Sequence, residues 1–171
     1  LRDPANAARL RIDPARIAVA GHSMGGLVAA HAGASDPKVI GVAMISAWNL
    51  GAIVAQCKAR GQEGREAFVQ AMMQNMESLA GCTPQSLTDD AFEHGAAWNF
   101  REYAAKLAPR PLLLISSRDG NEPESIALAV AARKAGGKAV DETVMETDHS
   151  YSDHRIALQA GLVRWVGGVG R

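Results

Sequence analysis

The segment Gly21–Gly26, with the sequence Gly-His-Ser-Met-Gly-Gly, constrains the fold of this chain more than any other feature. It directly follows an apolar run at 16–20 and leads into a run of small residues at 25–34. A Gly-x-Ser-x-Gly pattern between a buried strand and a helix is typical of a turn so tight that its serine is strained. Such a turn exposes the Ser23 hydroxyl and leaves the Met24 backbone N–H facing a negative charge on oxygen. We therefore predict Ser23 as a nucleophile and Met24 as an oxyanion donor.

The neighbouring residues give the motif its weight, because the chain has 17 glycines and the bare pattern is weak. We expect glycine at positions 21 and 25 because a side chain at either would collide with the adjacent strand or helix. His22 lies inside the turn. We predict that it lines a substrate pocket, where it packs or hydrogen-bonds near the site rather than reacting.

Two further polar residues follow later strands of the predicted sheet. Asp119 lies three residues after the apolar run Pro111–Ser116, and His149 follows the partly alternating run Ala139–Glu146, which reads as an edge strand. Because parallel strands end at the same edge of a sheet, we expect Ser23, Asp119 and His149 to meet there. A serine, an acid and a histidine in this order predict nucleophile, orienting carboxylate and general base.

Other acids are weaker candidates for the orienting carboxylate. Asp148 is adjacent to His149, so its side chain is poorly placed to reach its neighbour's ring. Glu122 and Glu124 lie at the start of a predicted helix at 123–135, where carboxylates complement the helix dipole without any catalytic role.

His154 competes with His149 for the role of base. Ser152 or Asp153 is predicted to cap the following helix, at 153–166, which places His154 in the first helical turn rather than in the loop after the strand. We therefore favour His149.

The predicted elements alternate between strand and helix, which favours a parallel sheet with flanking helices. We expect strands at 16–20, 38–46, 111–116 and 139–146, and helices at 24–34, 123–135 and 153–166. Residues 49–108 interrupt this order with a long helical segment. We predict a helical cap at 49–108, inserted into a core formed by 1–48 and 109–171.

Within the predicted cap we expect helices at 50–60, 65–80 and 96–107, and a short one capped by Thr88 or Asp89. One side of the predicted helix at 65–80 carries an apolar stripe at helical spacing, formed by Phe68, Met72, Met73, Met76 and Leu79. Such a stripe is more often part of a core than a binding surface, although flexible methionines could also bind acyl groups of different size. Trp48, just past the strand at 38–46, is predicted to line the substrate pocket.

Three segments together resemble the α/β-hydrolase superfamily, with dienelactone-hydrolase-like and prolyl-oligopeptidase-like serine hydrolases as the most similar branch. Ile12–Gly26 resembles its nucleophile segment, Arg110–Asp119 its acid-bearing strand and loop, and Thr147–Tyr151 its histidine loop. The resemblance implies an α/β-hydrolase fold that cleaves small carboxylic esters through an acyl-enzyme, without cofactor or metal. A peptidase of prolyl-oligopeptidase type is the alternative. The pattern typical of dienelactone hydrolases proper has a cysteine as nucleophile, so the resemblance with Ser23 at this position argues against that activity.

The resemblance also implies amino-terminal strands that are missing here, because only one strand fits within residues 1–20. The segment 1–10 resembles the tail of a helix leading into it. After Arg16, the strand at 16–20 carries no charged residue that would protect it as an open edge of the sheet. We expect an amino-terminal segment of the same protein, or another chain, to complete the sheet and supply a second oxyanion N–H. The remaining hypothesis is a half-site or interaction module that is active only with that partner.

Charge and composition exclude several other classes. Eighteen basic and eighteen acidic residues give a net charge of zero, so no basic surface for nucleic acid is expected. No apolar run approaches the roughly 20 residues of a membrane span. Cys57 and Cys82 lack metal-ligand spacing and are predicted to be free buried thiols, with a disulfide bridge as the alternative. Localisation is left open between cytoplasmic and secreted.

Overall fold

The computed structural model describes residues 2–74 and 76–170 and contains two compact units. The first, which we call the sheet unit, comprises Leu1–Trp48 and Arg101–Arg171. The second, the helical unit, comprises Asn49–Phe100. The segment 101–108, which the sequence analysis placed in the insertion, therefore belongs to the sheet unit.

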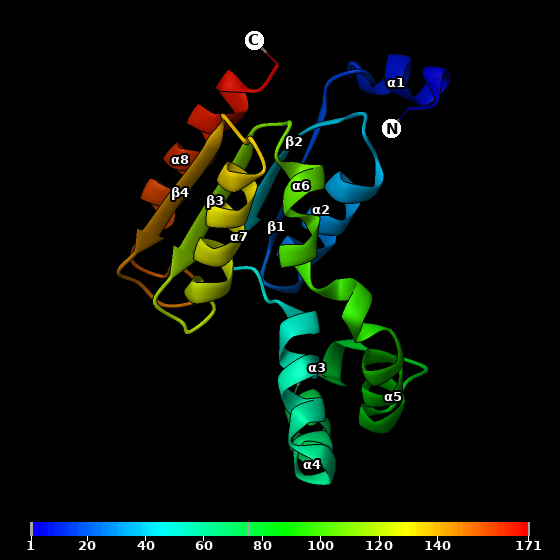
Figure 1. Cartoon of the computed structure of the whole chain (residues 1–171). Coiled ribbons are helices and arrows are strands. Elements are labelled where there is room, and N and C mark those ends of the chain that lie inside the picture. Colours follow the sequence, from blue (N-terminus) through cyan, green and yellow to red (C-terminus); the bar gives the residue numbers. More distant parts are fainter. Residues whose placement is uncertain (1, 75, 171) are drawn as a thin grey trace. The chain divides into compact units, whose positions relative to one another are not determined.

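The sheet unit is built on four parallel strands in the order β1–β2–β3–β4 (Figure 1). Their bounds are β1 (Ile17–His22), β2 (Val39–Ile45), β3 (Leu112–Ser117) and β4 (Val140–Met145). The predicted parallel sheet is confirmed. β4 lies at one end of the sheet and alternates in exposure, as a half-covered edge strand does. β1 lies at the other end and pairs with β2 alone among the described residues.

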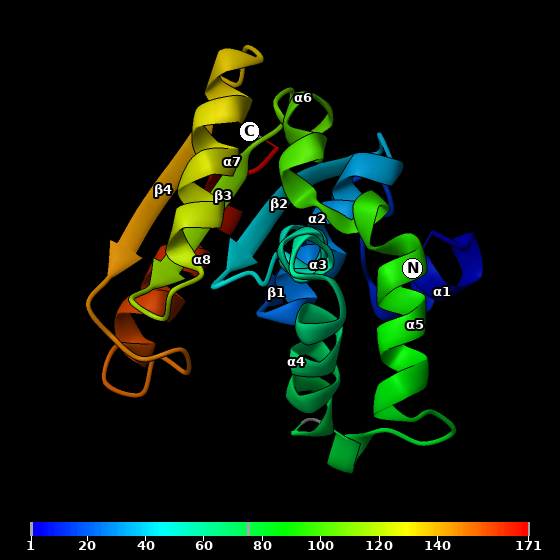
Figure 2. The same cartoon turned by 60° about the horizontal axis from the view of Figure 1, so that its bottom comes forward.

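Helices cover both faces of this sheet, in the arrangement of an α/β fold (Figures 1 and 2). One face carries α2 (Met24–Ser35), α6 (Ala104–Leu107) and α7 (Glu122–Lys134), and the other carries α8 (Arg155–Gly168). Side chains alternate along a strand. Accordingly Val42 faces α2, where a Cβ on Gly33 would meet it, while Ala43 packs with Trp165 of α8.

The helical unit contains α3 (Leu50–Ala59), α4 (Gly61–Met73) and α5 (Pro84–His94), followed by a 3₁₀ turn at Gly95–Trp98. Its interior is held by Phe68, which is 2% exposed and packs edge-on against Phe92 at 5.7 Å between ring centroids. Of the predicted apolar stripe, Met73 and Leu79 are exposed. Cys57 and Cys82 are free thiols, as predicted, but both are partly exposed rather than buried.

Three helices in this region were predicted with the wrong bounds. α4 begins at Gly61, whose φ of 60° lets the chain turn sharply from α3, and ends at Met73 rather than 80. Asn75 lies outside the described residues. α5 is capped by Thr83, not by Thr88 or Asp89, because Thr83 and Ser86 form a reciprocal capping box on either side of Pro84, the first residue of the helix. The helix expected at 96–107 is three short pieces, the second of which is Phe100–Tyr103.

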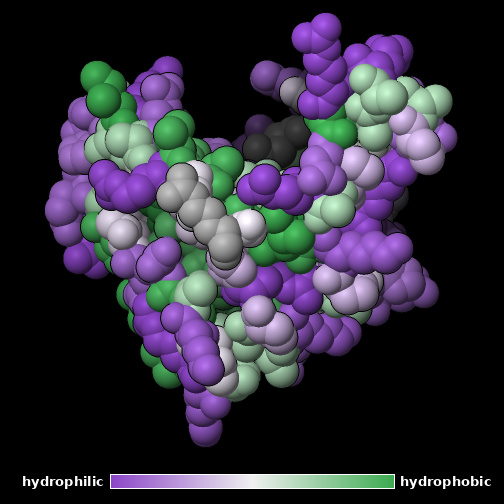
Figure 3. Space-filling view, turned by 90° about the horizontal axis from the view of Figure 1, so that it is seen from above, coloured by the Kyte–Doolittle hydropathy of each residue, from purple (hydrophilic) through white to green (hydrophobic). Residues whose placement is uncertain are grey.

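The amino-terminal helix α1 (Pro4–Leu10) is capped by the Asp3 side chain; Leu1 lies outside the described residues. The end of the sheet unit where the strands begin bears a hollow of about 770 Å³ lined by residues including Pro37, Lys38 and Pro111. Figure 3 views the molecule from this end, where hydrophobic residues lie among hydrophilic ones. Within residues 2–74 and 76–170, no helix is both long and apolar enough to cross a membrane.

Candidate active site

Ser23 occupies the turn between β1 and α2 in a strained conformation, with φ 56° and ψ −120°. Such backbone geometry costs a non-glycine residue roughly 1–3 kcal/mol. Three main-chain hydrogen bonds hold it. The Ser23 N–H donates to Ile45 O at 2.8 Å, and Ser23 O accepts from Gly26 N at 3.0 Å and Trp48 N at 3.1 Å. The turn is therefore fixed by the start of its own helix and by the end of the neighbouring strand β2.

The glycines of this turn differ in why they are needed. A Cβ at Gly21 would lie 1.9 Å from the carbonyl oxygen of Gly25, so only glycine fits there. The same expectation for Gly25 is wrong, because a Cβ there would meet no described atom within 4 Å. Gly25 takes part in the close approach to Gly21 through its carbonyl oxygen, whereas its Cα faces open space. The second crowded position is Gly26, where a Cβ would lie 2.6 Å from that of Ala47.

Met24 is the first residue of α2, immediately after Ser23. The first N–H groups of a helix have no partner inside the helix, and they carry its positive dipole end. This position is compatible with the predicted oxyanion role of the Met24 N–H, which stays a prediction.

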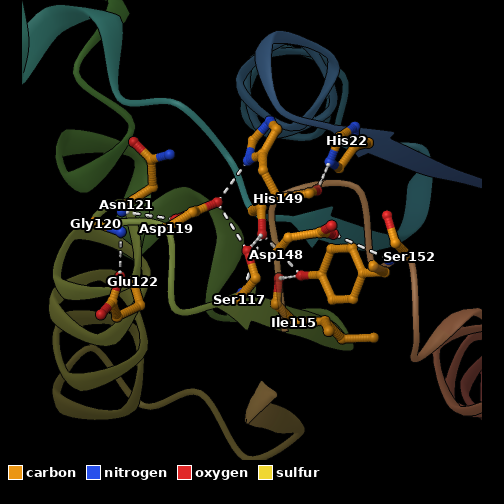
Figure 4. A network of polar contacts seen from close by, with 12 residues as sticks. His22, Ile115, Ser117, Asp119, Gly120, Asn121, Glu122, Asp148, His149 and Ser152 are labelled. Carbon is orange, nitrogen blue, oxygen red and sulfur yellow. Dashed lines mark hydrogen bonds and ion pairs between the residues drawn. The ribbon is translucent and has the colours of Figure 1, made fainter. Parts of the chain in front are cut away.

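Asp119 and His149 are brought together from the loops after β3 and β4 (Figure 4). His149 Nδ1 lies 2.5 Å from Asp119 Oδ2. Because an ionised carboxylate only accepts hydrogen bonds, Nδ1 carries the hydrogen. In the neutral ring the other nitrogen, Nε2, then holds a free lone pair, which is the form that a general base requires.

The Asp119 carboxylate is 8% exposed and is held by several donors. Burial acts to raise its pKa, but hydrogen bonds from His149, the Asn121 backbone and Ser117 outweigh burial, so that the pKa lies below its ordinary value. The Asn121 N–H donates to Oδ1 and the Ser117 hydroxyl to Oδ2, each at 2.8 Å. Asp119 is therefore ionised at neutral pH.

His22, the last residue of β1, contacts the histidine loop directly. Its Nε2 lies 2.8 Å from the carbonyl oxygen of His149, and the two ring centroids are 4.6 Å apart. Since a carbonyl oxygen only accepts, Nε2 of His22 carries a hydrogen. This contact brings the loop of His149 against the residue that precedes Ser23.

No hydrogen bond joins the Ser23 hydroxyl to the His149 ring in the described part of the chain; the recorded ring bond of His149 goes to Asp119. Catalytic hydrogen bonds are often long before substrate binds. Trp48 donates its backbone N–H to Ser23 O, and its side chain is partly exposed. The pocket roles of His22 and Trp48 stay predictions.

The competing acids have other partners. Asp148 Oδ1 accepts from the Ser152 backbone N–H at 2.9 Å. Glu122 accepts from the Gly120 N–H, and Glu124 forms an ion pair with Arg101.

His154 lies at the N-cap of α8, which begins at Arg155, so the predicted cap at Ser152 or Asp153 is wrong. Its Nδ1 pairs with Asp153 at 2.9 Å. The hydrogen bond from the Thr147 hydroxyl, followed by the contact with the His154 ring, lowers the pKa of Asp153 to about 2. Asp153 bonds the Thr147 hydroxyl, and the N-cap residue His154 makes no side-chain cap hydrogen bond to α8.

The sequence analysis missed three hydroxyl residues that lie behind Asp119, namely Ser46, Ser117 and Tyr151. Ser46 follows β2 and Ser117 ends β3, so their positions at strand ends are the signal that would have found them. Among the described residues, no cluster of histidine, cysteine or acidic side chains has the form of a metal site.

Comparison with known proteins places these features in context. A family model described as the alpha/beta hydrolase fold matches residues 3–153. An enol-lactonase from Burkholderia xenovorans LB400 is 20% identical, with a TM-score of 0.54, and 95% of this chain aligns with 69% of that one. A Pyrococcus furiosus esterase is 19% identical (TM-score 0.61; 90% of this chain, 54% of that one).

An acylaminoacyl peptidase of Pyrococcus horikoshii is also 19% identical, with a TM-score of 0.58, and 88% of this chain covers 23% of it. The chain thus spans about half of the esterase and a quarter of the peptidase. A search of curated proteins found no match.

Proposed function

This chain belongs to the α/β-hydrolase fold family, and we propose from that premise that it is a serine hydrolase that cleaves carboxylic esters through an acyl-enzyme. The observation that carries the proposal is the strained backbone of Ser23 at the same end of the sheet as the hydrogen-bonded pair Asp119 and His149. A strained serine persists only where the surrounding structure holds it, and such strain clusters at active sites.

In the proposed reaction Ser23 Oγ attacks the ester carbonyl carbon while His149 Nε2 takes the hydroxyl proton. The Asp119 carboxylate keeps the hydrogen on Nδ1 and stabilises the imidazolium that forms. His149 then protonates the departing alcohol, and water repeats the sequence on the acyl-enzyme. The Met24 N–H donates to the oxyanion, a contact whose loss typically costs about 100- to 1,000-fold in rate.

Ester cleavage is preferred to peptide cleavage because two of the similar structures are named as an esterase and an enol-lactonase. A lactone is a cyclic ester, so both act on the same bond type. The acylaminoacyl peptidase shares the fold over a quarter of its length, and the residues described here supply no observation that favours a peptide substrate.

Covalent labelling tests the proposal. A fluorophosphonate probe reacts with activated serines, and peptide mass mapping identifies the modified residue. We expect labelling at Ser23, none in Ser23→Ala, and normal labelling in the control Ser35→Ala at the far end of α2. Labelling that persists in Ser23→Ala, or an unmodified Ser23 in the folded chain, would refute the proposed mechanism.

We also propose that a further strand, from an amino-terminal segment or a second polypeptide, pairs with the free side of β1. The support is that β1 is an end strand without a charged residue between Ile17 and Gly21. Native mass spectrometry of the protein from its natural source tests this idea. A species heavier than 18.0 kDa, with slowly exchanging β1 amides, is expected. A lone chain of that mass with fast-exchanging amides would contradict it.

A further inference from the structure

Three hydroxyl groups form a buried network behind the Asp119 carboxylate. Ser46 and Ser117 are completely buried, and Tyr151 is 1% exposed. They come from the end of β2, the end of β3 and the histidine loop after β4, so three separate segments meet at this point. We call Ser46, Ser117 and Tyr151 the hydroxyl network.

The direction of each hydrogen bond follows from the number of hydrogens available. The Ser117 hydroxyl donates its single hydrogen to Asp119 Oδ2 at 2.8 Å (Figure 4). Its 2.8 Å contact with Ser46 Oγ must therefore come from a hydrogen on Ser46. Ser46 Oγ in turn accepts from the Ser117 N–H at 3.1 Å.

The Tyr151 hydroxyl is the last group of the network. It lies 2.8 Å from Ser46 Oγ, whose hydrogen is already committed, and 3.2 Å from Ile115 O. Both neighbours are acceptors, so Tyr151 is a donor whose single hydrogen is shared between them. Burial raises the pKa of Tyr151, which keeps this hydroxyl protonated. Both serine hydroxyl hydrogens thus run towards the Asp119 carboxylate, with Tyr151 as the donor at the far end.

Asp119 Oδ2 accepts two hydrogen bonds at once, one from Ser117 Oγ in the hydroxyl network and one from His149 Nδ1. Tyr151 lies only two residues after His149. The network therefore connects back to the loop that carries the base, and Asp119 and His149 are joined both directly and through the three hydroxyls.

Backbone strain marks the same residues. Among described non-glycine residues, positive φ occurs at Arg11, Ser23, Ser46 and Tyr151. Ser46 has φ 39° and Tyr151 has φ 54°, so two of the three network residues are strained in addition to Ser23. Strain of this kind persists where surrounding contacts over-determine the conformation. Here those contacts include the bonds of the hydroxyl network together with main-chain bonds from Ser46 N to Ile115 O and from Tyr151 N to Asp148 O, and hydrogen-bonded buried networks make a region rigid.

We propose that Ser46, Ser117 and Tyr151 are positioning residues that hold Asp119 Oδ2 in line with His149 Nδ1 and tie the histidine loop to the ends of β2 and β3. This inference rests on the proposed function, and it involves no proton transfer along the hydroxyls. Their role is to keep the acid and the base in one geometry while the imidazole changes charge.

The proton in the Asp119–His149 hydrogen bond provides a readout that needs no turnover. A proton in a short hydrogen bond from an imidazole N–H to a carboxylate resonates at low field in the NMR spectrum. We expect Ser117→Ala to move or broaden this signal and Tyr151→Phe to change it less. Two matched controls should leave it in place: Ser116→Ala, a buried serine on the same strand, and Tyr103→Phe, a buried tyrosine bonded to His31.

Kinetics separate positioning from packing. Ser117→Ala should lower kcat about tenfold, as expected for a lost hydrogen bond to a charged group, with KM nearly unchanged. Ser117→Thr, which restores a hydroxyl, should recover most of the rate. In an Asp119→Asn background Ser117→Ala should cost little more, because the carboxylate that it orients is gone.

Two results would overturn this inference. One is that Ser117→Ala and Tyr151→Phe show the same low-field NMR signal and the same kcat as the two control variants. The other is an equal rate loss with and without the Asp119 carboxylate, which indicates packing alone. Should Ser117→Ala fail to melt cooperatively, Ser117→Thr and Tyr151→Phe decide the outcome. Failure of the proposed function is separate, since an unlabelled Ser23 with a responsive low-field signal rejects the hydrolase but keeps the network.

Discussion

His22 donates a hydrogen bond from Nε2 to the main-chain carbonyl oxygen of His149, 2.8 Å away, although 127 positions separate the two residues. The contact joins the last residue of β1 to the loop after β4, and β1 and β4 are the two outermost strands of the described sheet. A single side chain therefore ties the histidine loop to the turn that carries Ser23.

We predict that His22→Ala lowers kcat for p-nitrophenyl butyrate roughly tenfold, because the histidine loop loses a donor that holds it. His22→Gln, whose amide can donate to the same carbonyl, should recover part of the rate. His31→Ala, on the outer part of α2, serves as the control. Equal rates for His22→Ala and His31→Ala would show that this contact does not position the base.

Ser23→Gly should be inactive but more stable than the wild type. Glycine adopts φ 56° and ψ −120° without the clash that strains serine, so about 1–3 kcal/mol of strain is released. Ser23→Ala is the matched control, since alanine also removes the hydroxyl but keeps the Cβ and thus the strain. Chemical denaturation measures both. A Ser23→Gly variant no more stable than Ser23→Ala would argue against strain at this turn.

The Asp119 carboxylate should contribute a pH-dependent part of the stability. Its pKa in the folded chain lies below the ordinary 3.8, so folding favours the ionised form. This contribution is fully present above that ordinary value and is lost as pH falls through the lowered folded value. The melting temperature of wild type should therefore drop more steeply than that of Asp119→Asn between about pH 5 and pH 2. Parallel curves for the two proteins would contradict the assignment.

His149→Ala should reduce ester hydrolysis by several orders of magnitude, close to the loss in Ser23→Ala, because triad members act as a unit. His154→Ala should be much milder, since its ring pairs with the exposed Asp153 at the start of α8. Asp119→Asn should cost less than His149→Ala. Initial rates with p-nitrophenyl acetate rank the three variants, and a larger loss in His154→Ala would transfer the role of base to that residue.

The glycines of the turn predict opposite outcomes for the same substitution. Gly21→Ala should prevent folding of the turn, because the new methyl group would overlap the backbone carbonyl of Gly25. Gly25→Ala should leave the melting temperature of the described chain nearly unchanged, because its Cβ would enter open space. Thermal melts followed by circular dichroism compare the two. Similar destabilisation by both would indicate that another segment covers Gly25.

The sequence by itself determined the parallel sheet and the order in which Ser23, Asp119 and His149 follow its strands. These features are readable because apolar runs such as Leu112–Ile115 and tight turns such as Gly21–Gly26 express local propensities of the chain. Parallel strands also end at one edge of a sheet, so residues that follow them are predicted to converge. The helical unit was harder to predict, since several residues that can cap a helix, Thr83, Thr88 and Asp89, lie within a few positions of one another.

Only the tertiary structure decided which groups contact each other at that edge. The bond from Ser46 to Ser117 spans 71 positions and that from Ser46 to Tyr151 spans 105. Such pairings depend on the register of neighbouring strands and on the path of each loop, and no local pattern encodes either. The same holds for Gly25 and Gly26, because only the folded structure shows that the Gly25 carbonyl oxygen faces Gly21 of β1 and that the Gly26 Cα faces Ala47 after β2. A strand pattern specifies which residues reach the edge of the sheet, whereas the packing of distant segments specifies the geometry in which they meet.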